Sequence, residues 1–265
     1  MNESQNRGLE ILNLTKAYNS EVVAVDNLTL SVSPAEIFAM LGANGAGKTT
    51  TLMCCLGFTE PTKGTVKING IDVVRNPLDA KKHVAYVSEN VRLYPNFTAR
   101  QNLDFFTKLA GKKHISRHDY DAVLGRVGLD KSAFHRRVKG FSKGMRQRLG
   151  IGIAIMKEAR VILLDEPTSG LDPKGGKEFL GLLDELRSEG RAILMTTHDI
   201  FRARQIADRV GIMNSGHMMR IISREEAQRE SLEDLYLKYV ETPVGTRDEA
   251  KVGDTESENQ TPRSQ

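Results

Sequence analysis

The chain of 265 residues has only two cysteines, and these are adjacent at Cys54 and Cys55. Neighbouring cysteines supply neither a disulfide framework nor a C-x-x-C metal site, so the sequence is typical of a reducing compartment. Tryptophan is absent, and no apolar run reaches the roughly 18 residues that a membrane-spanning helix needs. The polar N-terminus also lacks the apolar segment of a secretion signal. These absences predict a cytoplasmic protein that reaches a membrane only through the bilayer surface or a partner.

Neither sign of charge is in large excess, because 38 Lys and Arg residues balance 34 Asp and Glu residues to a net charge of +4. The distribution is uneven, however. Between residues 111 and 148, eleven Lys and Arg residues stand against three Asp residues. Such a basic stretch suits phosphate, anionic lipid or nucleic acid. Residues 241–265 are acidic and nearly without apolar side chains, which predicts a disordered acidic tail.

Short strands alternate with helices along most of the chain. Residues 9–14 and 22–32 alternate apolar and polar side chains, which predicts a small antiparallel β layer. From about 96 to 157 the apolar spacing is three or four residues, which predicts an inserted all-helical subdomain. Elsewhere, apolar strands followed by helices indicate a mainly parallel sheet in an α/β core. We therefore expect one domain over residues 1–240.

A phosphate-binding motif follows the apolar run at residues 36–41. The pattern G-x-x-x-x-G-K-[S/T] is typical of P-loops, whose glycines let backbone N–H groups wrap around phosphates at the start of a helix. Lys48 would bind the β- and γ-phosphates, and the Thr49 hydroxyl would ligate Mg²⁺. The residues expected to bind nucleotide here are Gly42, Ala43, Asn44, Gly45, Ala46, Gly47, Lys48, Thr49 and Thr50.

Two adjacent carboxylates end a second apolar run, at residues 161–166. A buried strand would deliver both of them to the carboxyl edge of the sheet, beside the P-loop. Asp165 would hold Mg²⁺, and Glu166 would orient or deprotonate the water that attacks the γ-phosphate. Together the two motifs predict an enzyme that hydrolyses a nucleotide.

Further motifs accompany the P-loop: FSKGM at 141–145, LLDEPTSGLD at 163–172 and THD at 197–199. With these motifs in this order, the sequence over residues 9–240 resembles the ATP-binding subunits of ABC transporters. The resemblance implies an α/β fold with a RecA-like P-loop core, an antiparallel β layer and an inserted helical subdomain. It implies ATP and Mg²⁺ as ligands. It also implies that two copies close on two ATP molecules and drive a separate membrane permease.

The resemblance assigns roles that the spacing of the residues does not show. Tyr18 would stack on the adenine ring of ATP. Ser142 and the Gly144 backbone would bind the γ-phosphate of a nucleotide held by the opposite subunit. Asp172 would lie at the interface between the two subunits, and His198 would contact the γ-phosphate and keep the attacking water in line.

Two places in the sequence depart from the family's usual residues. Glu89 stands where the family has a glutamine; a carboxylate still ligates Mg²⁺ but adds negative charge. The signature segment, residues 141–145, has Lys143 and Met145 in place of a glycine and a glutamine. Neither change removes the donors of Ser142 or Gly144, so we expect a working site. The predicted catalytic residues are Glu166, His198, Lys48, Glu89 and Asp172, and the predicted Mg²⁺ ligands are Thr49, Asp165 and Glu89.

Residues 88–106 and 136–150 look most like ATPases of the ABC-2 type, which pair with exporter-like permeases. They also look like the subunit that assists maturation of the copper centre of nitrous-oxide reductase. The resemblance implies an ATPase subunit on the inner face of the cell membrane. The alternative is a soluble ABC-type ATPase that serves metal-cluster assembly or nucleic-acid machinery. Nucleic acid is not expected as a partner, because the chain has one P-loop and no sustained heptads.

Apolar side chains follow Glu89 in what is expected to be a loop. Val91, Leu93, Tyr94 and Phe97 supply them, and exposed apolar residues in a loop are typical of a partner site. The resemblance places a cytoplasmic helix of the permease at this segment. The alternative is that these residues pack the loop onto the core.

Overall fold

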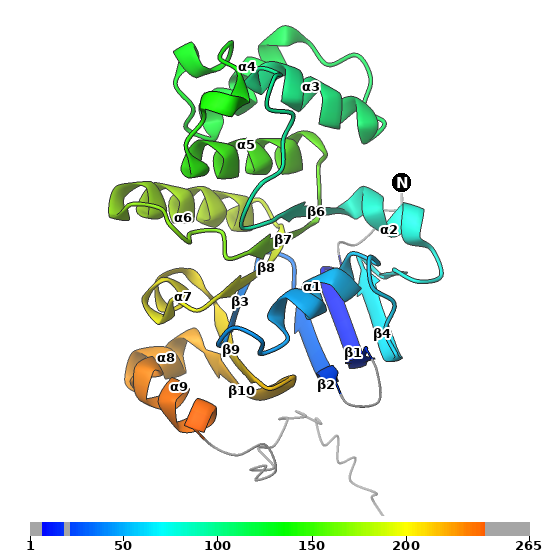
Figure 1. The fold of residues 1–265 in the computed structure, drawn as a ribbon, viewed down its shortest axis with the longest axis vertical. Coiled ribbons are helices and arrows are strands. Elements are labelled where there is room, and N and C mark those ends of the chain that lie inside the picture. Colours follow the sequence, from blue (N-terminus) through cyan, green and yellow to red (C-terminus); the bar gives the residue numbers. More distant parts are fainter. Residues whose placement is uncertain (1–6, 19–21, 242–265) are drawn as a thin grey trace, which may run out of the picture.

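The computed structural model describes residues 7–18 and 22–241, and these residues form two β-sheets (Figure 1). The larger sheet has the strand order β10-β9-β3-β8-β7-β6, in which only β10 is antiparallel to its neighbour. Strands β3, β7 and β8 are buried over their whole length, as expected for strands covered on both faces. The strands are β3 (Ile37–Leu41), β6 (Val84–Val87), β7 (Val161–Asp165), β8 (Ala192–Thr197), β9 (Arg209–Asn214) and β10 (His217–Ser223).

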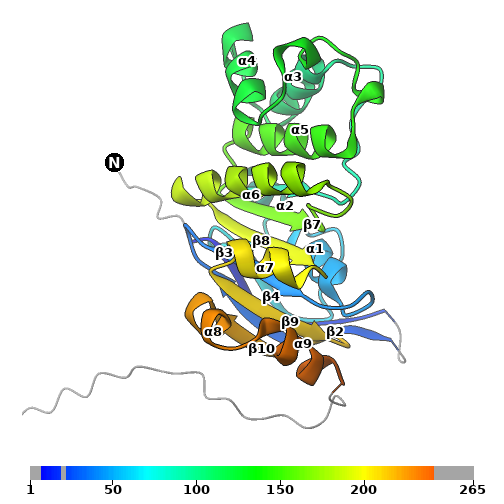
Figure 2. The same ribbon diagram turned by 90° about the vertical axis from the view of Figure 1, so that its left-hand side faces the viewer.

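The smaller sheet is antiparallel, with the strand order β2-β1-β4-β5. It lies beside helix α1 (Lys48–Cys55), at one side of the molecule (Figures 1 and 2). Leu52 and Cys54 of α1 share one buried cluster with Leu9 of the small sheet and Phe38 of the large sheet. The predicted antiparallel layer is therefore confirmed, and α1 joins it to the core. Its strands are β1 (Leu9–Ala17), β2 (Val23–Val32), β4 (Lys63–Ile68) and β5 (Ile71–Asp72).

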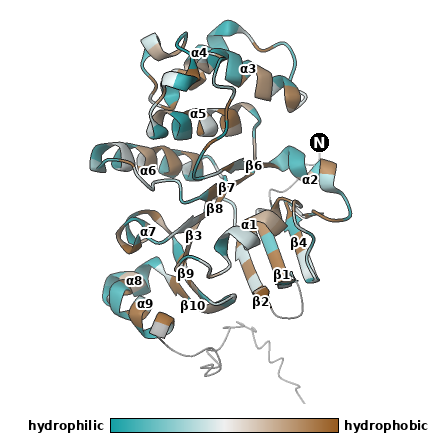
Figure 3. Cartoon of the chain, in the orientation of Figure 1, coloured by the Kyte–Doolittle hydropathy of each residue, from teal (hydrophilic) through white to brown (hydrophobic). Residues whose placement is uncertain are grey.

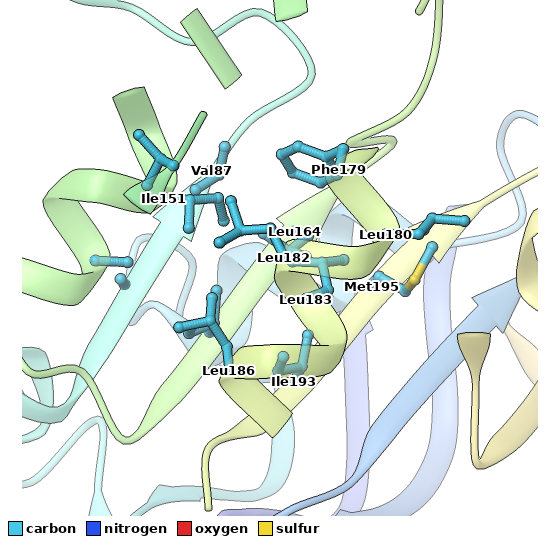
Figure 4. Close-up of a cluster of buried hydrophobic side chains, with 14 of the residues drawn as sticks. Val87, Ile151, Leu164, Phe179, Leu180, Leu182, Leu183, Leu186, Ile193 and Met195 are labelled. Atoms are coloured by element: carbon cyan, nitrogen blue, oxygen red, sulfur yellow. The ribbon is translucent and has the colours of Figure 1, made fainter. Parts of the chain in front are cut away.

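Helices cover the opposite face of the large sheet. Because side chains alternate along a strand, Leu163 packs toward α1, while Leu164 packs toward α5 (Lys143–Met156) and α6 (Pro173–Ser188). Figure 4 shows this second cluster, in which Phe179 of α6 and Ile151 of α5 lie near Leu164. Hydrophobic residues follow the strands of this sheet, and hydrophilic residues colour parts of the outer helices (Figure 3). Helix α7 (Ile200–Ile206) packs beside β3.

The helices between β6 and β7 lie together at one end of the molecule (Figure 1). They are α3 (Ala99–Leu109), α4 (Arg117–Arg126) and α5, with two short 3₁₀ turns at Lys131–Ala133 and Val138–Gly140. Helices α3 and α4 each begin with a capping box, Thr98 with Gln101 and Ser116 with Asp119, which explains where they start. The all-helical insertion predicted at about 96–157 is present.

The remaining helices are α2 (Pro77–His83), α8 (Arg224–Arg229) and α9 (Leu232–Glu241). Proline at the first position of α2 suits a helix start, because its missing N–H needs no partner there. Among the described residues, no helix is both long and apolar enough to cross a bilayer. The tail predicted at 241–265 lies, from residue 242 on, outside the described residues.

The two cysteines give a direct test of how α1 is packed. Cys54 and Cys55 are 0% and 1% exposed, and burial raises the pKa of Cys54 to about 11 and that of Cys55 as well. Because the thiolate is the reactive form, native protein at pH 8 should react with iodoacetamide about 100-fold more slowly than protein unfolded in urea. Mass spectrometry of timed samples measures the rate. Equal rates in the two states would contradict the packing of α1 between the sheets.

Candidate nucleotide-binding site

The predicted P-loop runs from the end of β3 into the first turn of α1. Gly45 and Gly47 have φ angles of 81° and 102°, which residues with a side chain disfavour. A Cβ atom at Gly47 would lie 2.3 Å from the Ala24 carbonyl oxygen, and one at Gly42 would lie 2.5 Å from the Met213 carbonyl oxygen. The loop therefore needs glycine to pass so close to strands β2 and β9.

A pocket of about 250 Å³ opens at this loop. Lys48, Thr49 and Thr50 begin α1, and the N–H groups of the first helical residues have no partner within their helix. These donors and the positive end of the helix dipole suit a phosphate group. The pocket is lined by Ala24, Ala43, Asn44, Gly45, Ala46, Gly47, Lys48, Thr49, Thr50, Glu89, Asp165 and Glu166.

The Lys48 ammonium is buried and has three oxygen partners. Nζ donates to the carbonyl oxygens of Gly42, at 2.6 Å, and of Ala43, at 3.2 Å. It also lies 3.5 Å from Oε1 of Glu166. A buried ammonium without such partners is unstable, so the cation holds the loop and the carboxylate together. Phosphate oxygens would offer the same kind of partner.

Asp165 ends β7 beside three hydroxyl groups. The Thr196 hydroxyl of β8 donates to Oδ1 at 2.6 Å. The Thr49 and Tyr86 hydroxyls lie 3.2 Å and 3.4 Å from Oδ2. Burial, reinforced by the Asp165 charge, raises the pKa of Tyr86, so its hydroxyl stays protonated and donates. Two of the three predicted Mg²⁺ ligands, Thr49 and Asp165, are therefore neighbours.

Glu166 follows in a turn, with a φ angle of 46°. Its N–H donates to the carbonyl oxygen and the hydroxyl of Thr196, at 3.2 Å and 3.1 Å. Its side chain is 15% exposed; Oε2 lies 3.0 Å from Nδ1 of His198. Within the described structure, Oε1 is buried and accepts no hydrogen bond, although it faces Lys48. Glu166 thus presents a carboxylate at the pocket, with Oε1 in an ion pair with Lys48 and Oε2 beside His198, and a carboxylate can accept a proton from water.

Glu89 follows β6 and lines the same pocket. Its Oε1 accepts hydrogen bonds from Nζ of Lys143 and Oγ of Ser169, both at 3.0 Å. These two donors, Lys143 first, hold the pKa of Glu89 below its ordinary value, so the side chain is ionised. The pocket thus has a third carboxylate beside Asp165 and Glu166.

Four of the predicted site residues, three nucleotide contacts and the interface residue Asp172, lie outside the pocket. Ser142 and Asp172 are helix caps, whose side chains accept backbone N–H groups in the first turns of α5 and α6. Gly144 lies in the first turn of α5, and Tyr18 is 58% exposed. In the described part of the chain, none of the four lines the pocket. One subunit therefore brings together the P-loop, Asp165, Glu166, His198 and Glu89, but not these residues.

Sequence analysis missed three residues of the site, Tyr86, Ser169 and Thr196. Thr196 and Tyr86 both lie near the carboxyl ends of parallel strands, where ligand-binding side chains gather. Thr196 directly precedes the THD segment, so its place at the end of a strand could have indicated a role in the site. Ser169 carried no separate signal, because its contact with Glu89 joins residues 80 apart in the chain.

Comparisons with known proteins identify the family of the chain. The ABC transporter family model matches residues 25–169. The bacitracin transport ATP-binding protein BcrA of Bacillus licheniformis is 35% identical, over 92% of this chain and 77% of its own length. The lantibiotic transport ATP-binding protein SrtF of Streptococcus pyogenes is 32% identical, over 86% of this chain and 95% of its own length.

Solved structures show the same fold. An ATP-binding subunit of an ABC transporter superposes with a TM-score of 0.78 at 28% identity, covering 87% of this chain and 98% of that one. A dimeric ATP-binding cassette in a post-hydrolysis state, bound to ADP and Pi, has a TM-score of 0.74 at 25% identity. That match covers 82% of this chain and 98% of the other.

A P-loop core with an Asp–Glu pair and a helical insertion defines a nucleotide-hydrolysing protein. The chain belongs to the ABC transporter family, and it is an ATP-binding subunit with ATPase activity. The family resemblance, the fold class and the ATPase prediction are therefore confirmed. The relatives' names give no support to copper-enzyme maturation, so that part of the prediction is withdrawn. The relatives' names also favour a transporter subunit over the alternative of a soluble ABC-type ATPase.

Replacing Lys48 tests the phosphate role of the pocket. In wild-type protein, ATP at 100 times its Kd should add about 2.7 kcal/mol to the free energy of unfolding. Lys48→Ala removes the buried cation, so this ATP-dependent gain should disappear, whereas Lys177→Ala, at an exposed site on α6, should keep it. Melting curves with and without Mg·ATP measure the gain. An unchanged gain in Lys48→Ala would exclude the role of Lys48 in binding.

Proposed function

We propose that the chain is the ATP-hydrolysing subunit of an exporter, which works as a dimer on the inner face of the cell membrane and drives a separate permease. The observation that carries the proposal is the pocket that joins the P-loop to Asp165, Glu166 and Glu89. Relatives named for bacitracin and lantibiotic transport support a peptide antibiotic, or a related compound, as the exported substrate.

Thr49 and Asp165 would hold Mg²⁺. Both offer hard oxygen donors, and their oxygen atoms lie 3.2 Å apart, which fits this ion. Within residues 7–18 and 22–241, no three His, Cys, Asp or Glu side chains gather as a metal site. Water and phosphate oxygens would therefore complete the ligand set, as Mg²⁺ commonly requires, with Glu89 at the edge of the same pocket. When bound, Mg²⁺ neutralises charge on the β- and γ-phosphates.

Glu166 is the proposed general base. Its carboxylate would accept the proton of the water that attacks the γ-phosphate, and His198 on Oε2 would keep the carboxylate oriented. Lys48 would exchange the Gly42 and Ala43 carbonyl oxygens for phosphate oxygens. That exchange moves positive charge to where negative charge develops during hydrolysis.

A second subunit would complete each site. Ser142, Gly144 and Asp172 lie outside the pocket of their own chain, which is consistent with a role across a dimer interface. The N-terminus of α5 offers N–H donors and positive partial charge to a phosphate that approaches from outside the subunit. The related cassette described as dimeric supports this arrangement. Tyr18, which is largely exposed, would stack on adenine.

Part of the segment after Glu89 is suited to contact the permease. Val91 and Leu93 pack against the core, so they are not docking residues. Tyr94 and Phe97 are 45% and 37% exposed, and their rings stack with centroids 5.1 Å apart. A neighbouring groove on α3 is mainly apolar and is lined by Phe97, Gln101, Asp104, Phe105, Lys108 and Leu109. We assign this surface to a cytoplasmic helix of the permease.

Glu166→Gln tests the proposed reaction. The amide keeps the size of the side chain but cannot take a proton, so ATPase activity should fall at least about 100-fold. Binding of Mg·ATP should persist, and the variant should accumulate as an ATP-bound dimer in gel filtration. Glu185→Gln, an exposed change on α6, is the matched control. Near-normal turnover in Glu166→Gln would refute the role of Glu166 as base.

Tyr94→Ala and Phe97→Ala test the permease contact. Each variant should lose most of its sedimentation with membranes that contain the permease, because interface anchors of this kind often carry more than about 1 kcal/mol. Soluble ATPase activity should be retained. Phe201→Ala removes another exposed aromatic ring, on α7, and should bind membranes like wild type. If both test variants also bind like wild type, the surface is not the docking site.

A further inference from the structure

The two departures from the family's usual residues meet in space. Lys143 Nζ lies 3.0 Å from Oε1 of Glu89, although the residues are 54 positions apart in the chain. Ser169 donates to the same oxygen. Three segments converge at this carboxylate: the one after β6, the start of α5, and the one between β7 and α6.

The surroundings keep the pair together. Gln147, one turn after Lys143 on α5, donates from Nε2 to the backbone carbonyl oxygens of Ser88 and Glu89, at 3.1 Å and 2.8 Å. The N-terminal half of α5 is thereby held to the Glu89 segment by bonds other than the ion pair. The side chains of Glu89 and Lys143 are 43% and 26% exposed, and a pair this accessible contributes little to stability. Stability therefore does not account for it.

The ion pair instead affects the net charge that the pocket presents to ATP. ATP is a polyanion, and Glu89 lines its pocket together with Asp165 and Glu166. An added carboxylate without a counter-charge would repel the phosphates and weaken binding. Lys143 restores the balance, because its ammonium is a direct partner of the Glu89 carboxylate.

We propose that Lys143 is the counter-ion of Glu89 and acts through it as a positioning residue that allows the pocket to bind ATP. The inference rests on the proposed ATP site and extends it to the signature segment of the same chain. On this view, the positive charge of Lys143 compensates for the negative charge that Glu89 adds to the pocket. If Lys143 instead bound a phosphate held by the second subunit, Lys143→Gln would weaken ATP binding equally with and without the charge of Glu89.

A double-mutant cycle on full-length protein separates the two roles. Lys143→Gln should weaken ATP binding about tenfold, because it leaves the Glu89 charge unopposed. Glu89→Gln combined with Lys143→Gln should bind ATP within about twofold of Glu89→Gln alone, because no unpaired charge remains. Lys139→Gln removes the same charge from an exposed site nearby and is the control.

The probe is a fluorescent ATP analogue, titrated in EDTA and again with Mg²⁺. The EDTA series excludes any contribution from Mg²⁺ binding at Glu89, so the weaker binding of Lys143→Gln should appear in both series. Steady-state kinetics should show a raised KM with a smaller change in kcat. Lys143→Met, which keeps the apolar stem, repeats the test, and melting temperatures check that each variant is folded.

An equal loss of affinity from Lys143→Gln with and without Glu89→Gln would overturn the proposal, because Lys143 would then act on phosphate directly. Unchanged affinity in Lys143→Gln would overturn it as well, since the pair would then be an ordinary surface contact. If wild-type protein itself failed to bind the analogue, the ATP site would be wrong, and that result is distinct from either outcome.

Discussion

The rest of the site depends on the contacts that the buried Lys48 ammonium makes with oxygen atoms. The ammonium needs oxygen partners on every side, and the Gly42 and Ala43 carbonyls with the Glu166 carboxylate supply them. Those groups come from the ends of β3 and β7, which are separated in the sheet only by β8. The strand order therefore places the loop and the acidic pair at one edge, and β8 adds Thr196, whose hydroxyl donates to Asp165.

The helical insertion depends on the same edge. Helix α5 approaches β6 so closely that a Cβ atom at Gly150 would lie 3.1 Å from a methyl group of Val87. Gln147 is fully buried and donates to the carbonyl oxygens of the segment that follows β6. The segment after β6 and the start of α5 are thus joined by packed side chains and hydrogen bonds.

Much of this architecture could be predicted from local patterns. Glycine spacing predicted the P-loop, and apolar runs that end in polar residues predicted parallel strands with their chemistry at the carboxyl edge. What could not be predicted involves contacts between distant segments, such as Glu89 with Lys143, or Tyr86 with Asp165. Local spacing carries no information on these pairs, because they depend on how helices and strands pack. The separation of Val91 and Leu93 from Tyr94 and Phe97 has the same origin: packing of the loop decides which apolar side chains are covered.

The turn at Glu166 explains how the side chains of two adjacent residues, Asp165 and Glu166, reach the same pocket. Side chains alternate along a strand, so Asp165 and Glu166 in extended backbone would point to opposite faces of the sheet. The left-handed conformation of Glu166, with a φ angle of 46°, interrupts this alternation, and both carboxylates line the pocket. Such a conformation costs about 1–3 kcal/mol for a residue with a side chain. The Glu166 N–H offsets part of this cost through its hydrogen bonds to Thr196, and the same threonine holds Asp165. One hydroxyl of β8 thereby fixes the direction of both acids, so that Asp165 faces Thr49 while Glu166 faces Lys48 and His198.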